Sequence, residues 1–324
     1  MRSINNKVVV IGAGMVGSAV VDAMLSLGLV SEIAVIDRNM QRAEGVALDA
    51  SHTTSFAYSP NVHVHAGTFA DCADAQIIAV AAGASVQPGN VVHDRLSLAA
   101  ANAAVIRETM AKIRPYTTDA VLILISNPVD IVTYVAQNEF DYPRDHIIGT
   151  GTLLDTARLR RLIAEDYAVD TKNVHGYILG EHGDTAFAAW SMVSIAGVPL
   201  QDAARIFHRP VPLDKEALVR EVRQAGYHIV QLKGYTNAGV ANSVSRIAKA
   251  VMLHECSVLP VSTTLTGEYG IRNVALSLPC VITGRGIGQV LEIPLSPEEQ
   301  EQMHRCAEHL RAVLLHLDAL PGRQ

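Results

Sequence analysis

A histidine lies within a glycine-rich segment at residues 180–184, which read Gly-Glu-His-Gly-Asp. An imidazole takes up and releases a proton near neutral pH, so histidine often acts as a general acid or base. Gly180 and Gly183 leave the backbone free to turn sharply around His182. We therefore predict that His182 moves a proton to and from a substrate oxygen.

An aspartate and an arginine lie at helical spacing upstream of this segment, as Asp155 and Arg158. Side chains three residues apart on a helix project from one face, so both are expected to reach one site. The planar guanidinium group of arginine binds a carboxylate through two parallel hydrogen bonds. Arg158 is therefore predicted to bind the carboxylate of a small acidic substrate.

Near the start of the chain, residues 12–17 (Gly-Ala-Gly-Met-Val-Gly) have the glycine spacing of a dinucleotide-binding loop. The first glycine permits a tight turn, the second lets the backbone approach a pyrophosphate, and the third lets helix and strand come close. Free N–H groups at the start of the following helix favour the same anion. The candidate cofactor contacts in this loop are Gly12, Gly14, Val16 and Gly17.

An acidic residue ends the next predicted strand, where Asp37 lies twenty residues after Gly17. A carboxylate at this position accepts hydrogen bonds from the adenosine ribose hydroxyls and repels a 2′-phosphate, which favours NAD over NADP. Arg42 is a further candidate cofactor contact. Because Arg38 and Arg42 are close to Asp37 in the sequence, NADP stays open as an alternative.

These residues need a scaffold, and the first half of the chain has the pattern of a parallel sheet. Four segments are apolar throughout, as expected for strands that helices cover on both faces. The strands are predicted at residues 7–11, 32–37, 76–81 and 121–125, with helical stretches at 16–27 and about 97–113. Repeated strand–helix units predict an α/β fold with a doubly wound parallel sheet of the Rossmann type.

The second half has a mixed pattern that predicts an α+β domain. Short strands are expected at 174–179 and 186–193, and helices at 153–165, 218–229 with a stop near Gly234, 242–254, and from Ser296-Pro297 onward. The change of pattern near residues 149–151 predicts a dinucleotide-binding domain over residues 1–149. A substrate-binding, catalytic domain is predicted over residues 150–324.

Composition excludes several classes of protein. The chain has 324 residues, of which 49% are hydrophobic, and a formal net charge of -6. This composition excludes extensive disorder and gives no basic field for nucleic acid. No apolar stretch is long enough to span a membrane, and the glycine-containing run at residues 8–21 does not resemble a signal peptide. The four cysteines form no metal-ligand pattern, so we expect reduced thiols, no metal site and a cytoplasmic location.

Three segments together resemble one enzyme family. Residues 126–130 (Ser-Asn-Pro-Val-Asp), 149–158 and 180–184 have the order and separation found in the L-lactate/L-malate dehydrogenase family, and they are more similar to its lactate branch. The resemblance extends from Val8 to the last predicted helix. It implies an oxidoreductase that interconverts pyruvate and L-lactate with NAD, as in glycolysis and fermentation.

The resemblance also implies roles for individual residues. It matches Asp155 to the carboxylate that orients the catalytic histidine, here His182. Arg95 matches an arginine that enters the site on a closing loop and polarises the substrate carbonyl. Further family positions that contact cofactor or substrate are Gly83, Ala84, Asn127 and Thr236.

The loop before Arg95 departs from the family pattern, because it is three residues longer than in typical lactate enzymes. Val86 occupies the position that contacts the substrate side chain. A valine cannot pair with a second carboxylate, which argues against malate or oxaloacetate. Larger 2-oxo acids, as in the related L-2-hydroxyisocaproate dehydrogenases, stay open as substrates. Gln87 is the alternative specificity residue if the loop is shifted by one position.

Two further positions match the effector site of bacterial lactate dehydrogenases that fructose-1,6-bisphosphate activates. They are Arg160 and His175. The resemblance also implies a homotetramer or a homodimer. A non-catalytic dinucleotide-binding protein is the alternative from a different class, and the joint presence of Arg95, Asp155, Arg158 and His182 argues against it.

Overall fold

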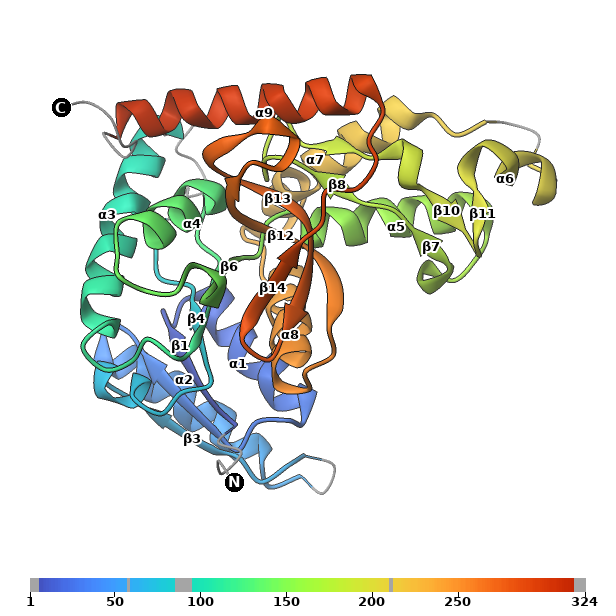
Figure 1. Cartoon of the computed structure of the whole chain (residues 1–324). Coiled ribbons are helices and arrows are strands. Elements are labelled where there is room, and N and C mark those ends of the chain that lie inside the picture. Colours follow the sequence, from blue (N-terminus) through green and yellow to red (C-terminus); the bar gives the residue numbers. More distant parts are fainter. Residues whose placement is uncertain (1–5, 57–58, 85–94, 210–211, 318–324) are drawn as a thin grey trace.

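The computed structural model describes residues 6–56, 59–84, 95–209 and 212–317. Among these residues, one large sheet of nine strands forms the centre of the molecule (Figure 1). From one edge to the other its strands are β14 (Gly286–Val290), β13 (Arg272–Thr283), β12 (Ser257–Thr266), β6 (Ile147–Gly149), β5 (Val121–Leu124), β4 (Ile77–Val80), β1 (Lys7–Ile11), β2 (Glu32–Ile36) and β3 (His63–Ala66).

The six strands from β3 to β6 are parallel, in the order expected of a Rossmann-type sheet. The four strands predicted from apolar runs are confirmed to within one residue at each end, and β1, β4 and β5 are buried along their whole length. The chain order reverses between β1 and β4. A crevice for ligands is expected at the carboxyl ends of the strands at such a point.

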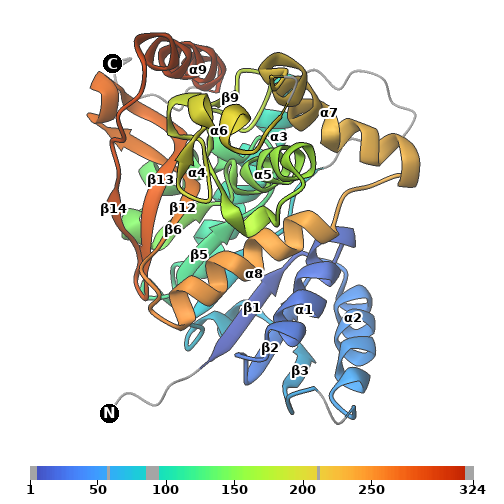
Figure 2. The same cartoon turned by 90° about the vertical axis from the view of Figure 1, so that its right-hand side faces the viewer.

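Helices cover both faces of this sheet. One face carries α1 (Met15–Leu27), α2 (Met40–Thr53) and α8 (Ala238–Met252), whose buried side chains form one core with the strands. The opposite face carries α3 (Arg95–Ile113) and α4 (Val129–Asn138). Figure 2 shows α8, which comes from the second half of the chain, beside α1 of the first half.

The second half of the chain contains the remaining helices and several very short strands. The helices are α5 (Leu153–Tyr167), α6 (Leu200–Ile206), α7 (Lys215–Lys233) and α9 (Pro297–His316). The short strands are β7 (Val174–His175), β8 (Ile178–Leu179), β9 (Phe187–Ala188), β10 (Ser194–Ile195) and β11 (Val198–Pro199). One-turn 3₁₀ helices lie at Phe69–Cys72, Arg144–His146, Thr171–Asn173, Trp190–Met192 and Glu268–Gly270.

Two strand predictions in this half are wrong in their extent. The segment 174–179 is interrupted at Gly176, whose φ of +156° breaks it into β7 and β8. The segment 186–193 is a strand only at β9, because a 3₁₀ turn follows at Trp190–Met192.

The predicted ends of two helices are confirmed. Gly234 closes α7 in the left-handed conformation, with φ +87°. Ser296 caps α9 in a capping box with Glu299, and Pro297 is its first residue.

The sequence analysis missed a long antiparallel pair, β12 and β13, which extends the main sheet beyond β6. These strands come from the second half of the chain, so the sheet continues across the predicted domain boundary at residue 149. The described helices include none that is long and apolar enough to cross a membrane. All four cysteines have free thiols, and only Cys256 is exposed.

Candidate active site

The glycine loop after β1 is held in place by two close approaches of backbone to backbone. Gly12 has φ +104°, and a Cβ there would lie 2.7 Å from the backbone nitrogen of Ala82 at the end of β4. A Cβ on Gly17 would overlap the carbonyl oxygen of Gly12. Any larger residue at either position would therefore push the loop away from the strand or the helix that it joins.

Gly14 differs from these two glycines because a Cβ there would meet nothing within 4 Å. Gly14 is exposed and is the N-cap of α1, so open space lies in front of the free N–H groups of that helix. This is the arrangement that a pyrophosphate needs when it approaches the backbone. The loop therefore leaves open space beside Gly14, where a dinucleotide would approach the backbone.

Asp37 lies at the end of β2 beside this loop. Its Oδ2 accepts a hydrogen bond of 2.8 Å from the Ala13 N–H, and its Oδ1 accepts one of 2.8 Å from the Asn39 N–H. Each carboxylate oxygen has a second lone pair, which is available to a ribose hydroxyl. Arg42 is exposed on the first turn of α2, whose N-cap is Asn39. The predicted cofactor residues of this region thus lie together, just beyond the carboxyl ends of β1 and β2.

A buried asparagine that the sequence analysis did not assign to the site joins the loops after β4 and β5. Asn102 of α3 accepts a hydrogen bond of 2.6 Å from the Ala84 N–H. Its Nδ2 donates to the carbonyl oxygens of Ala84 at 3.0 Å and Asn127 at 2.6 Å. Gly83 lies in the same junction, since a Cβ on it would be 2.8 Å from the Ser126 hydroxyl oxygen. Asn102 therefore fixes the spacing between two loops that the resemblance assigns to cofactor binding.

The structure brings His182 together with the aspartate and the arginine of α5. The Nδ1 atom of His182 lies 2.5 Å from Oδ2 of Asp155, and Arg158 donates to the other oxygen, Oδ1, at 2.9 Å. The Asp155 side chain is almost fully buried, whereas His182 and Arg158 are partly exposed. Among the described residues none forms a hydrogen bond with Nε2 of His182. The carboxylate thus orients the ring and leaves its second nitrogen for proton exchange.

These contacts set the protonation state of the pair. Burial disfavours the imidazolium of His182, but the charge of Asp155 and their hydrogen bond outweigh it and raise the pKa of His182 to about 9. Burial also opposes ionisation of Asp155, yet the charges of His182 and Arg158 hold the pKa of this carboxyl below its usual range. The site at neutral pH therefore holds an imidazolium, a carboxylate and a guanidinium, and it can donate a proton from His182.

A second buried aspartate contacts the backbone of His182 rather than its ring. Asp130 of α4 accepts a hydrogen bond of 2.7 Å from the His182 N–H and another of 2.5 Å from the Ser262 hydroxyl on β12. Asp130 is 2% exposed, and burial raises its pKa to about 7. The sequence analysis included Asp130 only as the last residue of the Ser-Asn-Pro-Val-Asp motif. Nothing in the local pattern indicated that it contacts a loop 52 residues away.

The two other sides of the His182 loop are also fixed. Gly180, with φ +86°, exchanges two backbone hydrogen bonds with Ser277 of β13, at 3.1 and 2.8 Å. Glu181 accepts hydrogen bonds from Thr185 and, at 3.0 Å, from Nδ1 of His309 on α9. The glycine predicted to allow a sharp turn therefore does so where the loop joins β13 of the main sheet.

The remaining candidate residues have different positions. Val86 and Gln87 lie outside the described residues, and Arg95 is described only as the first residue of α3. Thr236 lies in the turn between α7 and α8, partly buried. A groove between α5 and α7 is lined by Arg158, Arg161, Asp184 and Arg223, among other residues, so the predicted carboxylate-binding arginine faces an open cleft.

The two candidate effector residues lie near each other. The Nε–H of Arg160 donates to the carbonyl oxygen of Gly176 at 3.1 Å, and its guanidinium lies 5.5 Å from the centre of the Tyr177 ring. His175, next to Gly176, is exposed on β7. Burial lowers the pKa of Arg160.

Comparisons with known proteins show the family to which the chain belongs. Residues 6–149 match the family described as lactate/malate dehydrogenase, NAD binding domain, and residues 152–319 match the lactate/malate dehydrogenase, alpha/beta C-terminal domain. An L-lactate dehydrogenase 2 of Clostridium acetobutylicum is 55% identical over 98% of this chain and 99% of its own length. The L-lactate dehydrogenase of Selenomonas ruminantium is 46% identical over 95% of this chain and 96% of its own.

A solved structure has the same fold over nearly the whole chain. The crystal structure of the minor L-lactate dehydrogenase from Enterococcus mundtii in its ligands-bound form superposes with a TM-score of 0.91. The two chains are 37% identical, and the match covers 99% of this chain and 100% of the other. The predicted fold class, a doubly wound Rossmann sheet followed by a second domain with mixed helices and strands, is thereby confirmed.

Proposed function

Because the chain belongs to the lactate/malate dehydrogenase family, we propose that it is an NAD-dependent L-lactate dehydrogenase that interconverts pyruvate and L-lactate. Relatives from 36% to 55% identical over nearly the full chain carry the name L-lactate dehydrogenase. The observation that carries the proposal is the hydrogen-bonded series Arg158–Asp155–His182, because it combines a carboxylate-binding group with a proton donor of raised pKa.

The mechanism assigns one task to each of these side chains. Arg158 uses one nitrogen on Asp155, and its other N–H groups are available to bind the carboxylate of a 2-oxo acid. NADH, when bound across the carboxyl ends of the parallel strands, supplies the hydride that reduces the keto carbon. His182 then gives its Nε2 proton to the oxygen that becomes the hydroxyl, and Asp155 stabilises the imidazolium before that transfer. In the oxidation of lactate, neutral His182 takes the proton back.

Other residues complete this proposal. Gly12, Gly14, Val16, Gly17 and Asp37 form the cofactor cradle, with Arg42, Gly83 and Ala84 at its margins. Asn127 and Thr236 contact the nicotinamide or the substrate, and Arg95 polarises the substrate carbonyl. These assignments rest on the family resemblance together with the contacts described above for the loops after β1, β2, β4 and β5.

Substrate choice is tested with a panel of 2-oxo acids. The decrease of NADH absorbance is followed with pyruvate, 2-oxoisocaproate and oxaloacetate at equal concentrations. We expect the highest kcat/KM for pyruvate. Equal or faster turnover of 2-oxoisocaproate would instead assign the L-2-hydroxyisocaproate type of activity, and faster turnover of oxaloacetate would overturn the exclusion based on Val86.

The proposal extends to regulation, assembly and location. Arg160 and His175 are the proposed contacts for fructose-1,6-bisphosphate, and the protein is proposed to be a cytoplasmic homotetramer or homodimer. The panel is therefore repeated with the bisphosphate, for the wild type and for Arg160→Gln. If the bisphosphate activates the wild type but not Arg160→Gln, the effector site is supported. Light scattering with and without the bisphosphate gives the oligomeric state.

A further inference from the structure

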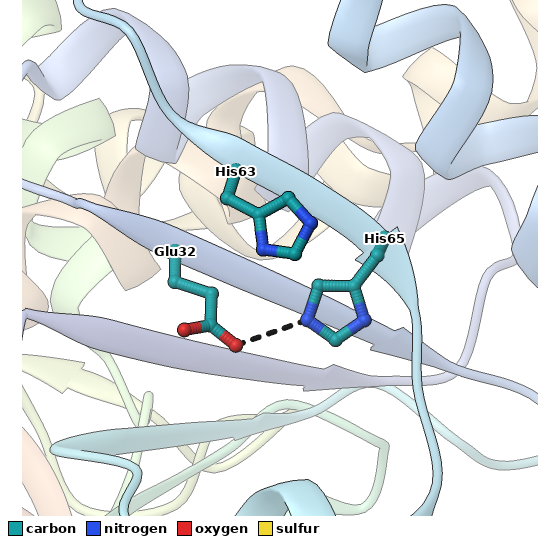
Figure 3. Close-up of side chains that lie close together, drawn as sticks. All are labelled: Glu32, His63 and His65. Atoms are coloured by element: carbon teal, nitrogen blue, oxygen red, sulfur yellow. Dashed lines mark hydrogen bonds and ion pairs between the residues drawn. The ribbon is translucent and has the colours of Figure 1, made fainter.

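A group of side chains with the chemistry of metal ligands lies at the opposite end of the sheet from the candidate active site. Glu32 begins β2, and His63 and His65 lie on β3, the edge strand (Figure 3). Residues two apart on a strand point to the same face, so both imidazoles lie on one side of the sheet. Glu32 pairs with His63 in the register of β2 and β3, which places its carboxylate on that side too.

The three side chains already lie close to one another. One ligand atom from each of them can be chosen so that all three lie within 4.8 Å of one another. Nε2 of His65 lies 3.0 Å from Oε1 of Glu32, and the rings of His63 and His65 are stacked with centroids 4.6 Å apart. In a tetrahedral zinc site with bonds of about 2.0–2.1 Å the ligand atoms lie about 3.4 Å apart. The pair Nε2–Oε1 already has nearly this spacing, so the nitrogen of His63 is the atom that has to approach. Exposed His63 can make this movement by a change of side-chain rotamer.

The second ring nitrogen of His65 supports the same use of the cluster. Nδ1 lies 3.0 Å from the carbonyl oxygen of Ala66, so it carries a proton and donates to that oxygen. The other ring nitrogen, Nε2, donates to Oε1 of Glu32 at 3.0 Å, and a metal ion would take the place of the proton that these two atoms share. A metal-binding histidine characteristically donates its other N–H to a carbonyl in this way.

The local charge also favours a further cation. Lys7 of β1 lies 3.1 Å from Glu32, 3.3 Å from Asp71 and 2.9 Å from Asp74, so one ammonium group faces three carboxylates. The ammonium group and the three carboxylates together carry a net charge of -2. A divalent ion bound by Glu32 would balance it, while Lys7 keeps its contacts with the two aspartates.

We propose that Glu32, His63 and His65 bind a divalent transition-metal ion of the Zn²⁺ class. Two imidazole nitrogens and one carboxylate oxygen are ligands that Zn²⁺ prefers, and solvent at the exposed edge supplies a fourth. Because the ligands come from two neighbouring strands, the ion would fasten the edge strand β3 to β2. It would act on stability rather than on the reaction, since the active-site loops follow the other ends of the strands.

The experiment is a calorimetric titration of Zn²⁺ into the full-length protein after dialysis against a chelator. We expect one ion per chain at this site and a rise of a few degrees in Tm when Zn²⁺ is in large excess over its Kd. His63→Ala should weaken binding by about tenfold or more and abolish the rise in Tm. Glu32→Gln, which keeps the shape of the side chain but removes its charge, should also weaken binding.

A matched control separates this site from other histidines. His304→Ala removes an exposed histidine on α9 and should bind Zn²⁺ as the wild type does. Co²⁺ in place of Zn²⁺ should give the strong visible absorption of a four-coordinate ion in the wild type and in His304→Ala, but not in His63→Ala. Wild-type affinity in His63→Ala would overturn the proposal, because the ion would then bind elsewhere. Absence of Zn²⁺ binding to the wild type would also overturn it.

Discussion

The proposed cofactor cradle (Gly12, Gly14, Val16, Gly17 and Asp37) and the proposed catalytic network (Asp130, Asp155, Arg158 and His182) are built from different kinds of interaction. In the cradle, backbone atoms lie in close contact with Gly12 and Gly17, which leaves no room for a side chain at either position. The charged residue of the cradle, Asp37, is only partly buried. In the catalytic network, two buried carboxylates hold His182: Asp155 binds its ring nitrogen Nδ1 and Asp130 binds its backbone N–H. The cradle depends on the absence of side chains, whereas the network depends on charges and their partners. Substitutions should therefore affect the two regions through different observables, stability and cofactor affinity in one and turnover and pH dependence in the other.

Replacement of His182 tests this separation with the largest expected effect. His182→Asn keeps a polar side chain of similar size but removes the proton donor. General acid–base catalysis contributes about 10²–10⁴-fold to a rate, so we expect kcat for pyruvate reduction to fall by about 10³-fold. NADH affinity, measured by fluorescence titration, should stay unchanged. Wild-type turnover in this variant would remove His182 from the proposed mechanism, and loss of NADH binding would show that the two regions are not separate.

The carboxylate of Asp155 should determine the pH at which the enzyme works. Because the pKa of His182 is raised to about 9, the ring is protonated at neutral pH. Pyruvate reduction needs that proton and should decline as pH rises through 9, whereas lactate oxidation needs the neutral ring and should increase over the same range. Asp155→Asn removes the main cause of the shift, so the pKa of His182 should fall towards 6.5 and kcat should drop by about 10²-fold at neutral pH.

The control for this prediction is Glu165→Gln. Glu165 is an exposed carboxylate at the other end of α5, paired with Arg161. Its removal takes one negative charge from the same helix without touching the site, so both pH profiles should match those of the wild type. An unchanged profile in Asp155→Asn would mean that another group sets the protonation of His182.

The contrast between the two regions also explains how far the sequence predicts the fold. Buried parallel strands are apolar throughout, and this signal located β1, β2, β4 and β5 almost to the residue. The short strands of the second half have two residues each, too few for a periodic pattern, and Gly176 divides one predicted segment. The long strands β12 and β13 were missed because their pairing joins distant parts of the chain.

Within the site, the sequence predicted residues that belong to compact motifs. The glycine loop, the Asp155–Arg158 spacing and the segment around His182 are each visible within about ten residues. Asn102 and Asp130 were not identified as parts of the site, because each acts through contacts with loops far away in the sequence. Local patterns predict the groups that do chemistry, and the residues that hold them in place emerge only from the three-dimensional contacts.

Substitutions of two glycines in the cradle test whether the close contact of backbone with backbone and the access of NADH to the loop are separate requirements. Gly17→Ala places a methyl group on the carbonyl oxygen of Gly12, so we expect a loss of about 1–3 kcal/mol in the free energy of unfolding. Gly14→Ala meets no atom within 4 Å and should leave Tm nearly unchanged while it weakens NADH binding. Thermal unfolding and NADH titration distinguish the two effects. Equal destabilisation by both substitutions would contradict the steric account.

Substitution of Asp130 should have the smallest effect, and it tests whether the second aspartate positions His182 or only fills the core. Asp130→Asn can still accept from the His182 N–H and can donate to the Ser262 hydroxyl, so the fold should be kept. The lost charge removes one of the interactions that raise the pKa of His182, so the decline in pyruvate reduction should shift to lower pH. We expect kcat to fall by no more than about tenfold, equivalent to about 1.4 kcal/mol.

Ser262→Ala is the matched control, because it removes the hydrogen bond on the other side of Asp130 and keeps the carboxyl group. The loss of this hydrogen bond raises the pKa of Asp130, so the pH profile is compared near pH 9, where His182 titrates. It should lower stability by about 1 kcal/mol without a shift in the pH profile. Asp130→Ala, which leaves the buried His182 N–H without its acceptor, should lower both stability and turnover. If Asp130→Asn and Ser262→Ala gave the same pH profile as the wild type, Asp130 would be a structural residue and the catalytic network would contain one buried charge rather than two.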